Sequence, residues 1–467
     1  MLMATHPVRE DSYLSRWLRV REYAVPPVMI ERSTARRTVG DWAGACAASR
    51  VDVDFDLPTV NRALGHEFTG QLRSDLRHLA PDLLRWHLPR TAPDGLLRGG
   101  LTISLARYRL PGRPGPVHLV ARTPPSWADG GQRFALALWT SDGDVTASDR
   151  RHHHPHRCPD PRFRLDLHRH LWDARRAGEL RERAGSVQQA RVPSELEPSY
   201  AVDRWCAEAA LLREAEGRPE LAVVVRLDTR RRLLLEPGAR LTSAGLDELP
   251  DGVAMLTVRE AAGLSVLPDA ATWTAPDLEL LRSGAIRPER LHPLVAAALA
   301  PGHPAPPRVR PDGSSAPALV DCQGARHRIA LVDGTLSPLD HDPAELHREQ
   351  LLSALGGTPM PCLRTIEQAH RHPEELTGVR ERLAHGDSAG ALAVVESLLG
   401  PAALLPEGPL RSALEAAAER RVTHGLYRAG LLGLVRVAPA RPRPPRPRTR
   451  FVSAVPRTRP RLATYRR

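Results

Sequence analysis

The 467-residue sequence contains no lysine, and all 66 of its basic residues are arginine. Without lysine, the chain cannot form a Schiff base with a carbonyl substrate or with pyridoxal phosphate. The phosphate-binding lysines of P-loop nucleotide-binding proteins and of protein kinases are excluded as well. Asparagine occurs once, at Asn61. Because lysine and asparagine have AT-rich codons, this usage indicates a GC-rich bacterial genome.

Long apolar runs and paired cysteines are also missing. No stretch of 18 apolar residues occurs, and the first 17 residues have neither the apolar core nor the cleavage site of a secretory signal. No two cysteines form a CxxC pair, which argues against a disulfide framework and a zinc ribbon. We therefore expect a cytoplasmic protein without a membrane partner. The five cysteines are Cys46, Cys158, Cys206, Cys322 and Cys362.

Positive charge is concentrated at the end of the sequence. From Arg436 onward there are eleven arginines and no acidic residue, which leaves 55 arginines against 54 acidic residues before it, a net charge of +1. The arginine–proline alternation over 441–450 favours an extended, disordered tail. Such a tail can contact phosphates independently of base sequence. The candidate anion or nucleic-acid contacts are Arg441, Arg443, Arg446, Arg448 and Arg450.

Residue patterns predict a multidomain α+β fold. A helical region over 1–97 is followed by a β-rich domain with trailing helices over 98–217 and an α/β region over 218–300. A proline-rich linker at 301–317 leads into a mostly helical domain with a β-hairpin at 318–435, and the disordered arginine–proline tail occupies 436–467. Within the β-rich part, we expect strands at 101–110, 116–121, 133–140 and 163–167, separated by Pro/Gly turns.

One eight-residue pattern occurs twice. Residues 40–47 (GDWAGACA) match residues 386–393 (GDSAGALA) at six of eight positions. In each copy a glycine ends one helix, an aspartate caps the next, and small residues allow the pair to pack closely. This pattern resembles the helix-hairpin unit of tetratricopeptide repeats, but two isolated copies do not make a solenoid. The composition and segments such as 82–90 (DLLRWHLPR) resemble proteins of high-GC actinobacteria, a resemblance that implies no functional residue.

The second copy also contains a G-x-S-x-G sequence, which resembles the nucleophile elbow of some esterases. An esterase needs a strand before the serine and an aspartate and a histidine after it. The residues before Ser388 are charged and helical in pattern, and no aspartate follows it. We therefore expect Ser388 to lie in the first turn of a helix that Asp387 caps.

Histidines cluster between residues 152 and 170. Imidazole and thiolate are zinc ligands, and four of them make a tetrahedral site. His168 and His170 would point the same way if they lay on a strand. Flanking arginines and Pro155 favour the alternative of a solvated turn. The candidate metal ligands are His152, His154, His156, Cys158, His168 and His170.

Two weaker sets complete the candidates. Asp52, Asp54 and Asp56 could bind a hard cation, although they lack the glycine and the terminal glutamate of an EF-hand and also fit a solvated strand face. Cys322 lies near His327 and near the acidic and histidine residues 340–342, so a reactive thiol is one reading and a packed, inert thiol is the other.

No complete catalytic motif emerges. We expect a non-enzymatic, cytoplasmic macromolecule-binding protein, an adaptor or scaffold with protein partners. One alternative is sequence-independent nucleic-acid binding through the tail. The other is a metal-dependent enzyme that uses the 152–170 cluster with zinc as its cofactor.

Overall fold

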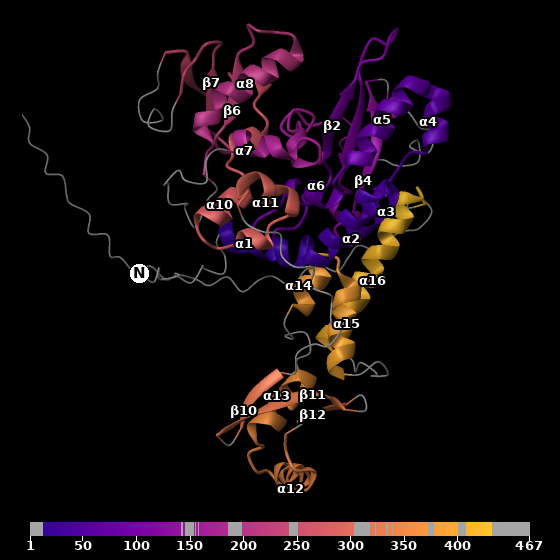
Figure 1. Cartoon of the computed structure of the whole chain (residues 1–467), viewed down its shortest axis with the longest axis vertical. Helices are drawn as coiled ribbons and strands as arrows, with labels where there is room; N and C mark the ends of the chain where they lie inside the picture. The colour runs from indigo at the N-terminus through magenta and orange to yellow at the C-terminus, as the bar shows by residue number, and fades with distance from the viewer. Residues whose placement is uncertain are drawn as a thin grey trace, which may run out of the picture.

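The computed structural model describes residues 13–141, 143–144, 154, 156, 158–184, 199–241, 251–302, 318–322, 324–332, 335–338, 340–371, 378–399 and 408–431. The predicted linker, except for its first two residues, and the whole arginine–proline tail lie outside these ranges. The fold is a mixed α+β, multidomain arrangement with several small sheets, as the sequence predicts (Figure 1).

The N-terminal region is helical. Pro27 and Pro81 are the first residues of two helices. Proline is favoured there because the backbone N–H that it lacks would have no acceptor within the helix. A short π-helix, Val20–Ala24, follows the first helix. The helices are α1 (Tyr13–Arg19), α2 (Pro27–Thr38), α3 (Trp42–Ala48), α4 (Leu57–Leu64), α5 (His66–His78) and α6 (Pro81–His87).

The largest sheet has the order β1-β4-β3-β2, with β5 paired to β4. β1 runs parallel to β4, and the remaining pairs are antiparallel. Nearly every residue of the three long strands is buried, so both faces of the sheet are covered and polar residues such as Ser104 and His118 are buried with the apolar ones. The strands are β1 (Val51–Val53), β2 (Thr102–Tyr108), β3 (Val117–Arg122), β4 (Phe134–Thr140) and β5 (Gly143–Asp144).

One hydrophobic core surrounds this sheet. It includes residues of the N-terminal helices, of the sheet, and of α10 (Pro276–Arg282) and α11 (Pro293–Leu299). Segments more than 200 residues apart in sequence therefore share one interior. The proposed boundaries at residues 97, 217 and 300 stay predictions.

A second core lies under a smaller sheet of order β8-β7-β6-β9. Its central hairpin, β6–β7, pairs Arg226 with Arg232. α8 contributes Trp205, which is fully buried and donates its indole N–H to the Thr272 carbonyl at 3.0 Å. The elements are α7 (Leu180–Arg183), α8 (Val202–Glu216), β6 (Val223–Arg226), β7 (Arg232–Leu235), β8 (Val253–Leu256), β9 (Ser265–Val266) and α9 (Asp269–Thr272).

The C-terminal part consists of a three-stranded sheet with two helices, followed by a helical group. The predicted hairpin exists and gains a third strand, in the order β10-β11-β12. In Figure 1 the helical group lies between this small sheet and the rest of the protein. The elements are β10 (Ala318–Cys322), β11 (Ala325–Val332), β12 (Thr335–Pro338), α12 (Pro343–Ala354), α13 (Pro361–Arg371), α14 (Val379–Ala384), α15 (Ser388–Leu399) and α16 (Pro409–Arg428).

The repeated sequence forms two matching helix hairpins, α2–α3 and α14–α15. The backbone N–H of Gly44 donates to Asp41 at 2.8 Å, and that of Gly390 donates to Asp387 at 3.2 Å. Ser388 is the first residue of α15, so the predicted aspartate cap is confirmed. In both hairpins, an arginine five residues before the aspartate pairs with it, at 3.1 Å for Arg36 and 3.0 Å for Arg382.

Candidate functional site

A cavity of about 340 Å³ lies where the N-terminal helices, the large sheet and the α9–α10 segment meet. Its walls come from α1, the chain after α6, β2, residues 162–171, and residues 269–276. This volume is at the lower end of the range for cavities that hold small organic ligands. Because the walls come from distant parts of the chain, no local sequence motif marks the cavity.

The cavity carries an excess of positive charge. Five arginines line it, against one acidic residue, Asp269. Arg162 pairs with Asp269 at 2.6 Å, and Arg183 pairs with Glu208. Among the described residues, no carboxylate forms an ion pair with the remaining three arginines, which are Arg16, Arg90 and Arg98.

Arg90 is held firmly in the wall. It donates to the carbonyl oxygens of Gly95 at 2.8 Å and Arg85 at 2.7 Å, while its buried Nε has no acceptor in the described part of the chain. Burial, followed by the positive charges of Arg21 and Arg16, lowers the pKa of Arg90 to about 9. At neutral pH the guanidinium is still charged, and a nearby anion would stabilise that charge.

Two further buried donors of the cavity wall lack partners. The Nε of Arg16 finds no acceptor in the described ranges, and its guanidinium carbon lies 5.0 Å from the Tyr13 ring centroid. His87 Nε2 lies 3.9 Å from the nearest Asp277 oxygen, which is too far for a hydrogen bond. Burial, followed by nearby positive charges, lowers the pKa of His87 to about 3, so the ring is neutral at pH 7. An unmet buried hydrogen bond costs about 1–3 kcal/mol, and a bound anion could accept these bonds.

The remaining wall is largely apolar and aromatic. Tyr13, Trp17, Phe163 and Trp273 line the cavity. The guanidinium carbon of Arg90 lies 5.9 Å from the centre of the Trp17 ring, so one donor and one aromatic surface are adjacent. This combination suits a ligand with an anionic group attached to a flat, apolar body.

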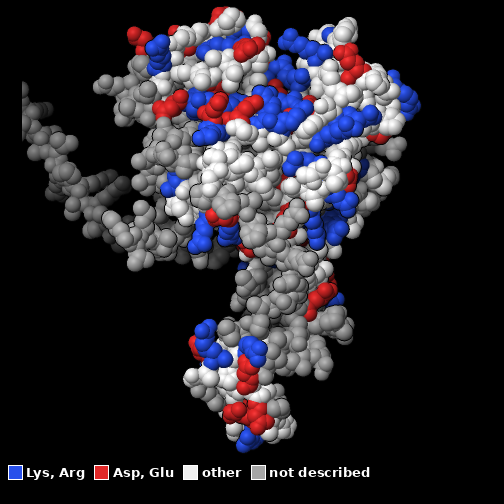
Figure 2. Space-filling view, viewed as in Figure 1, with Lys and Arg blue, Asp and Glu red and all other residues white. Residues whose placement is uncertain are grey.

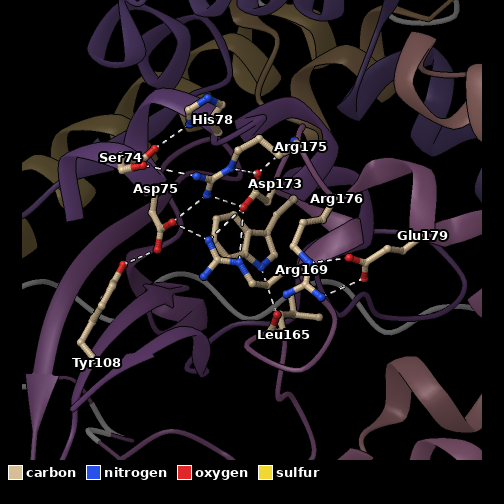
Figure 3. Close-up of polar contacts among 11 residues, drawn as sticks. Ser74, Asp75, His78, Tyr108, Leu165, Arg169, Asp173, Arg175, Arg176 and Glu179 are labelled. Carbon is tan, nitrogen blue, oxygen red and sulfur yellow. Dashed lines mark hydrogen bonds and ion pairs between the residues drawn. The ribbon is translucent and has the colours of Figure 1, made fainter. Parts of the chain in front are cut away.

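A salt-bridge network fixes the wall formed by residues 162–171 (Figure 3). Asp75 of α5 accepts hydrogen bonds from the Tyr108 hydroxyl at 2.8 Å and from Arg169 and Arg175. Asp173 accepts from the same two arginines, at 2.9 and 2.8 Å. The network therefore ties the wall to a helix and a strand of the main core.

The predicted histidine cluster is only partly described, because His152 lies outside the described residues. His154 is buried, with Nε2 at 2.9 Å from the Thr123 carbonyl oxygen, while Nδ1 contacts the backbone of His156. His156 and Cys158 are exposed. The contacts of His154 are those of a structural histidine that orders this segment.

The prediction of a strand at 163–167 is wrong, although the rings of His168 and His170 do lie close together, with centroids 5.8 Å apart. Arg164 makes an isolated bridge to Ser104, and residues 169–171 form a 3-10 helix. His168 Nε2 lies 3.2 Å from Glu208, and His170 Nδ1 lies 3.3 Å from Arg183. Ion pairs favour the turns: Arg164 pairs with Asp166 two residues later and with Glu216, and Arg169 pairs with Asp75 and Asp173.

Potential metal ligands converge elsewhere. Within the described ranges, the three side chains whose ligand atoms all lie within 4.8 Å of one another are Cys322, His341 and Cys362. The described members of the 152–170 cluster form no such group. Metal binding by the complete cluster, including His152, stays a prediction.

The aspartates of β1 have structural partners. Asp52 binds Arg133 and lies 3.4 Å from His424, and Asp54 pairs with Arg428 at 2.7 Å. These contacts attach α16 to the large sheet. The predicted contacts of the tail, Arg441, Arg443, Arg446, Arg448 and Arg450, lie outside the described residues.

No protein-family model, curated protein or solved structure matches this chain. None of the helices in the described ranges is both long and apolar enough to cross a membrane. Sequence reasoning missed Arg16, Arg90 and Arg98, because arginine is common throughout the chain and these three are far apart or set in irregular turns.

Proposed function

We propose that this protein binds a small organic anion, a carboxylate or phosphate attached to an aromatic or apolar body, in the cavity between α1, β2 and α10. The observation that carries the proposal is the set of three cavity-lining arginines that have no carboxylate partner among the described residues. Two of them, Arg16 and Arg90, also have a buried Nε–H without an acceptor among the described residues.

Electrostatics favours an anion over a neutral ligand. Buried arginines are usually paired with carboxylates, and oppositely charged side chains are interspersed on the surface seen in Figure 2. Arg16 and Arg90 are half-buried and have no such partner among the described residues, whereas the buried Arg85, outside the cavity, donates to two backbone carbonyls instead. A ligand carboxylate or phosphate would supply the missing acceptors, and each hydrogen bond to a charged group contributes about 1.5–3 kcal/mol.

Binding of phenyl phosphate, compared with neutral phenol, tests this proposal by isothermal titration calorimetry. Phenyl phosphate should bind and phenol should bind much more weakly, because the ring alone does not satisfy the arginines. Arg16→Gln should weaken phenyl phosphate binding about 10- to 100-fold, from the loss of one charged hydrogen bond. Arg16 is substituted rather than Arg90 because Arg90 also donates hydrogen bonds to two backbone carbonyl oxygens. The described contacts of the Arg16 guanidinium include no such backbone bond.

Arg19→Gln is the matched control. Arg19 lies on the same helix and donates to the Pro93 carbonyl at 3.1 Å, but it does not line the cavity. It should leave the affinity unchanged. Equal binding of phenol and phenyl phosphate, or equal loss in both arginine variants, would contradict the proposal.

The broader expectations stay predictions. An adaptor or scaffold role would require a protein partner, and the described chain is a single copy. Nucleic-acid binding would use tail arginines outside the described residues. Neither expectation conflicts with a ligand pocket in the main core.

A further inference from the structure

The C-terminal sheet brings two cysteines and two histidines together. Cys322 ends β10, His341 precedes α12, and Cys362 is the second residue of α13. The ligand atoms of these three residues lie within 4.8 Å of one another. Both cysteines are fully buried, and the side chain of His341 is 3% exposed. Three separate segments of the chain therefore meet at one protected point.

His327 lies beside this group. Its ring stacks on that of His341, with centroids 4.0 Å apart and an angle of 15° between the planes. His327 Nδ1 and His341 Nε2 are both buried, and neither has a hydrogen-bond partner among the described residues. Two unpartnered imidazole nitrogens beside two thiols are an unfavourable arrangement unless another group binds them.

The surroundings favour a metal ligand role for His341 Nε2. Its other ring nitrogen, Nδ1, lies 3.6 Å from a carboxylate oxygen of Glu345. Metal-binding histidines usually donate the second ring nitrogen to a carboxylate, and a movement of a few tenths of an ångström would bring Glu345 within hydrogen-bond distance. Asp340 is already engaged, because it accepts hydrogen bonds from the backbone and the guanidinium of Arg328.

Among the described side chains, few apolar groups are buried around the small sheet. Its buried cluster consists of Cys322, Met360 and Cys362, with three partly buried residues packed against them. Small units of this size usually need a disulfide or a metal ion in addition to their core. The cysteines are free thiols in this structure.

We propose that Cys322, His341, Cys362 and His327 bind one structural zinc ion. Two thiolates and two imidazoles are a tetrahedral zinc ligand set, whereas calcium and magnesium require oxygen ligands. Zinc–ligand bonds of about 2.0–2.3 Å place the ligand atoms roughly 3.3–3.8 Å apart, so small side-chain movements would bring Cys322, His341 and Cys362 around one ion. His327 lies outside the 4.8 Å group, and its ring would have to turn out of the stack with His341 to supply the fourth ligand. Each cysteine releases its thiol proton to solvent when it binds the metal. Four protein ligands leave no open position, so the ion holds β10, β11 and α13 together and does no chemistry.

The experiment is metal analysis of tag-free, reduced full-length protein that has been incubated with zinc sulfate and then dialysed. About one tightly bound zinc per chain should remain, and Cys362→Ser or His341→Ala should lose it. Cys206→Ser is the control, because Cys206 is a partly buried cysteine of α8, far along the chain from the site. It should retain the zinc. His154→Ala with His168→Ala should retain it too, which separates this site from the histidine cluster.

Cobalt substitution gives a readout that does not depend on variants folding. Cobalt(II) bound to the wild-type chain should show the intense visible absorption of a tetrahedral site and a thiolate-to-metal charge-transfer band. Absence of both bands, zinc retained by a Cys322→Ser/Cys362→Ser double variant, or a Cys322–Cys362 disulfide in protein purified without reductant would overturn the proposal. Undiminished zinc affinity in His327→Ala would remove His327 from the ligand set.

Discussion

Replacing Gly386 by alanine should detach the C-terminal hairpin from the rest of the protein. Gly386 has φ +81°, and a Cβ at this position would lie 2.0 Å from the carbonyl oxygen of Gly131. Gly40, at the equivalent position of the first hairpin, has φ +80° and open space around it. The two substitutions therefore impose the same backbone strain, and one of them adds a collision with the main chain.

The difference between them can be estimated. Left-handed φ costs an alanine about 1–2 kcal/mol, and a stiffer unfolded chain offsets about 0.4–1 kcal/mol, so Gly40→Ala should lose roughly 1 kcal/mol. In Gly386→Ala, the two backbones must also separate by more than 1 Å to reach an ordinary contact. That movement breaks the 2.7 Å hydrogen bond from Arg50 to the His385 carbonyl. We expect a further loss of about 2–4 kcal/mol.

Hydrogen exchange measured over residues 378–399, together with urea unfolding, tests this estimate. Gly386→Ala should show faster exchange in α14 and α15 and a lower unfolding free energy than Gly40→Ala. Equal stabilities, within about 0.5 kcal/mol, would refute the close Gly131–Gly386 approach.

Two further predictions concern the salt-bridge networks. Asp75→Asn should lower the unfolding free energy, measured by denaturant titration, by about 2–4 kcal/mol. The ion pair with the partly exposed Arg175 should contribute the least to this loss. Glu220→Gln, at a side chain that is 70% exposed, should change the unfolding free energy by less than about 0.5 kcal/mol. Burial alone would raise the pKa of Glu208, but hydrogen bonds from His168 and Arg183 outweigh it and lower the pKa to about 2. The stability that this ionised group provides is present above the unfolded pKa, near 4.3, and is lost as pH falls through about 2. Glu208→Gln should therefore flatten the acid limb of the stability–pH curve, and an unchanged limb would contradict this.

Local patterns were sufficient for much of the secondary structure. The segments between Pro/Gly turns predicted β2, β3 and β4, and the glycine–aspartate pattern predicted both helix hairpins together with the cap before Ser388. These features depend on residues that are close together in the sequence, so the sequence alone is sufficient to predict them.

Features that depend on distant contacts were not predicted. Residues 163–167 have strand-like composition, but Asp75 and Asp173 draw the following arginines into turns. The parallel pairing of β1 with β4 joins segments about eighty residues apart, for which no local signal exists. Cys322, His327 and His341 were identified as a possible reactive set, but Cys362 was not, because its proximity follows from the packing of α13 against β10. The unpaired state of Arg16 and Arg90 likewise becomes visible only in three dimensions.

A crystal structure of the protein with phenyl phosphate tests the central claim most directly. The account predicts the phosphate within hydrogen-bond distance of Arg16 and Arg90, and the ring against the aromatic wall formed by Tyr13, Trp17 and Trp273. An empty cavity, with phenyl phosphate bound elsewhere or not at all, would contradict it.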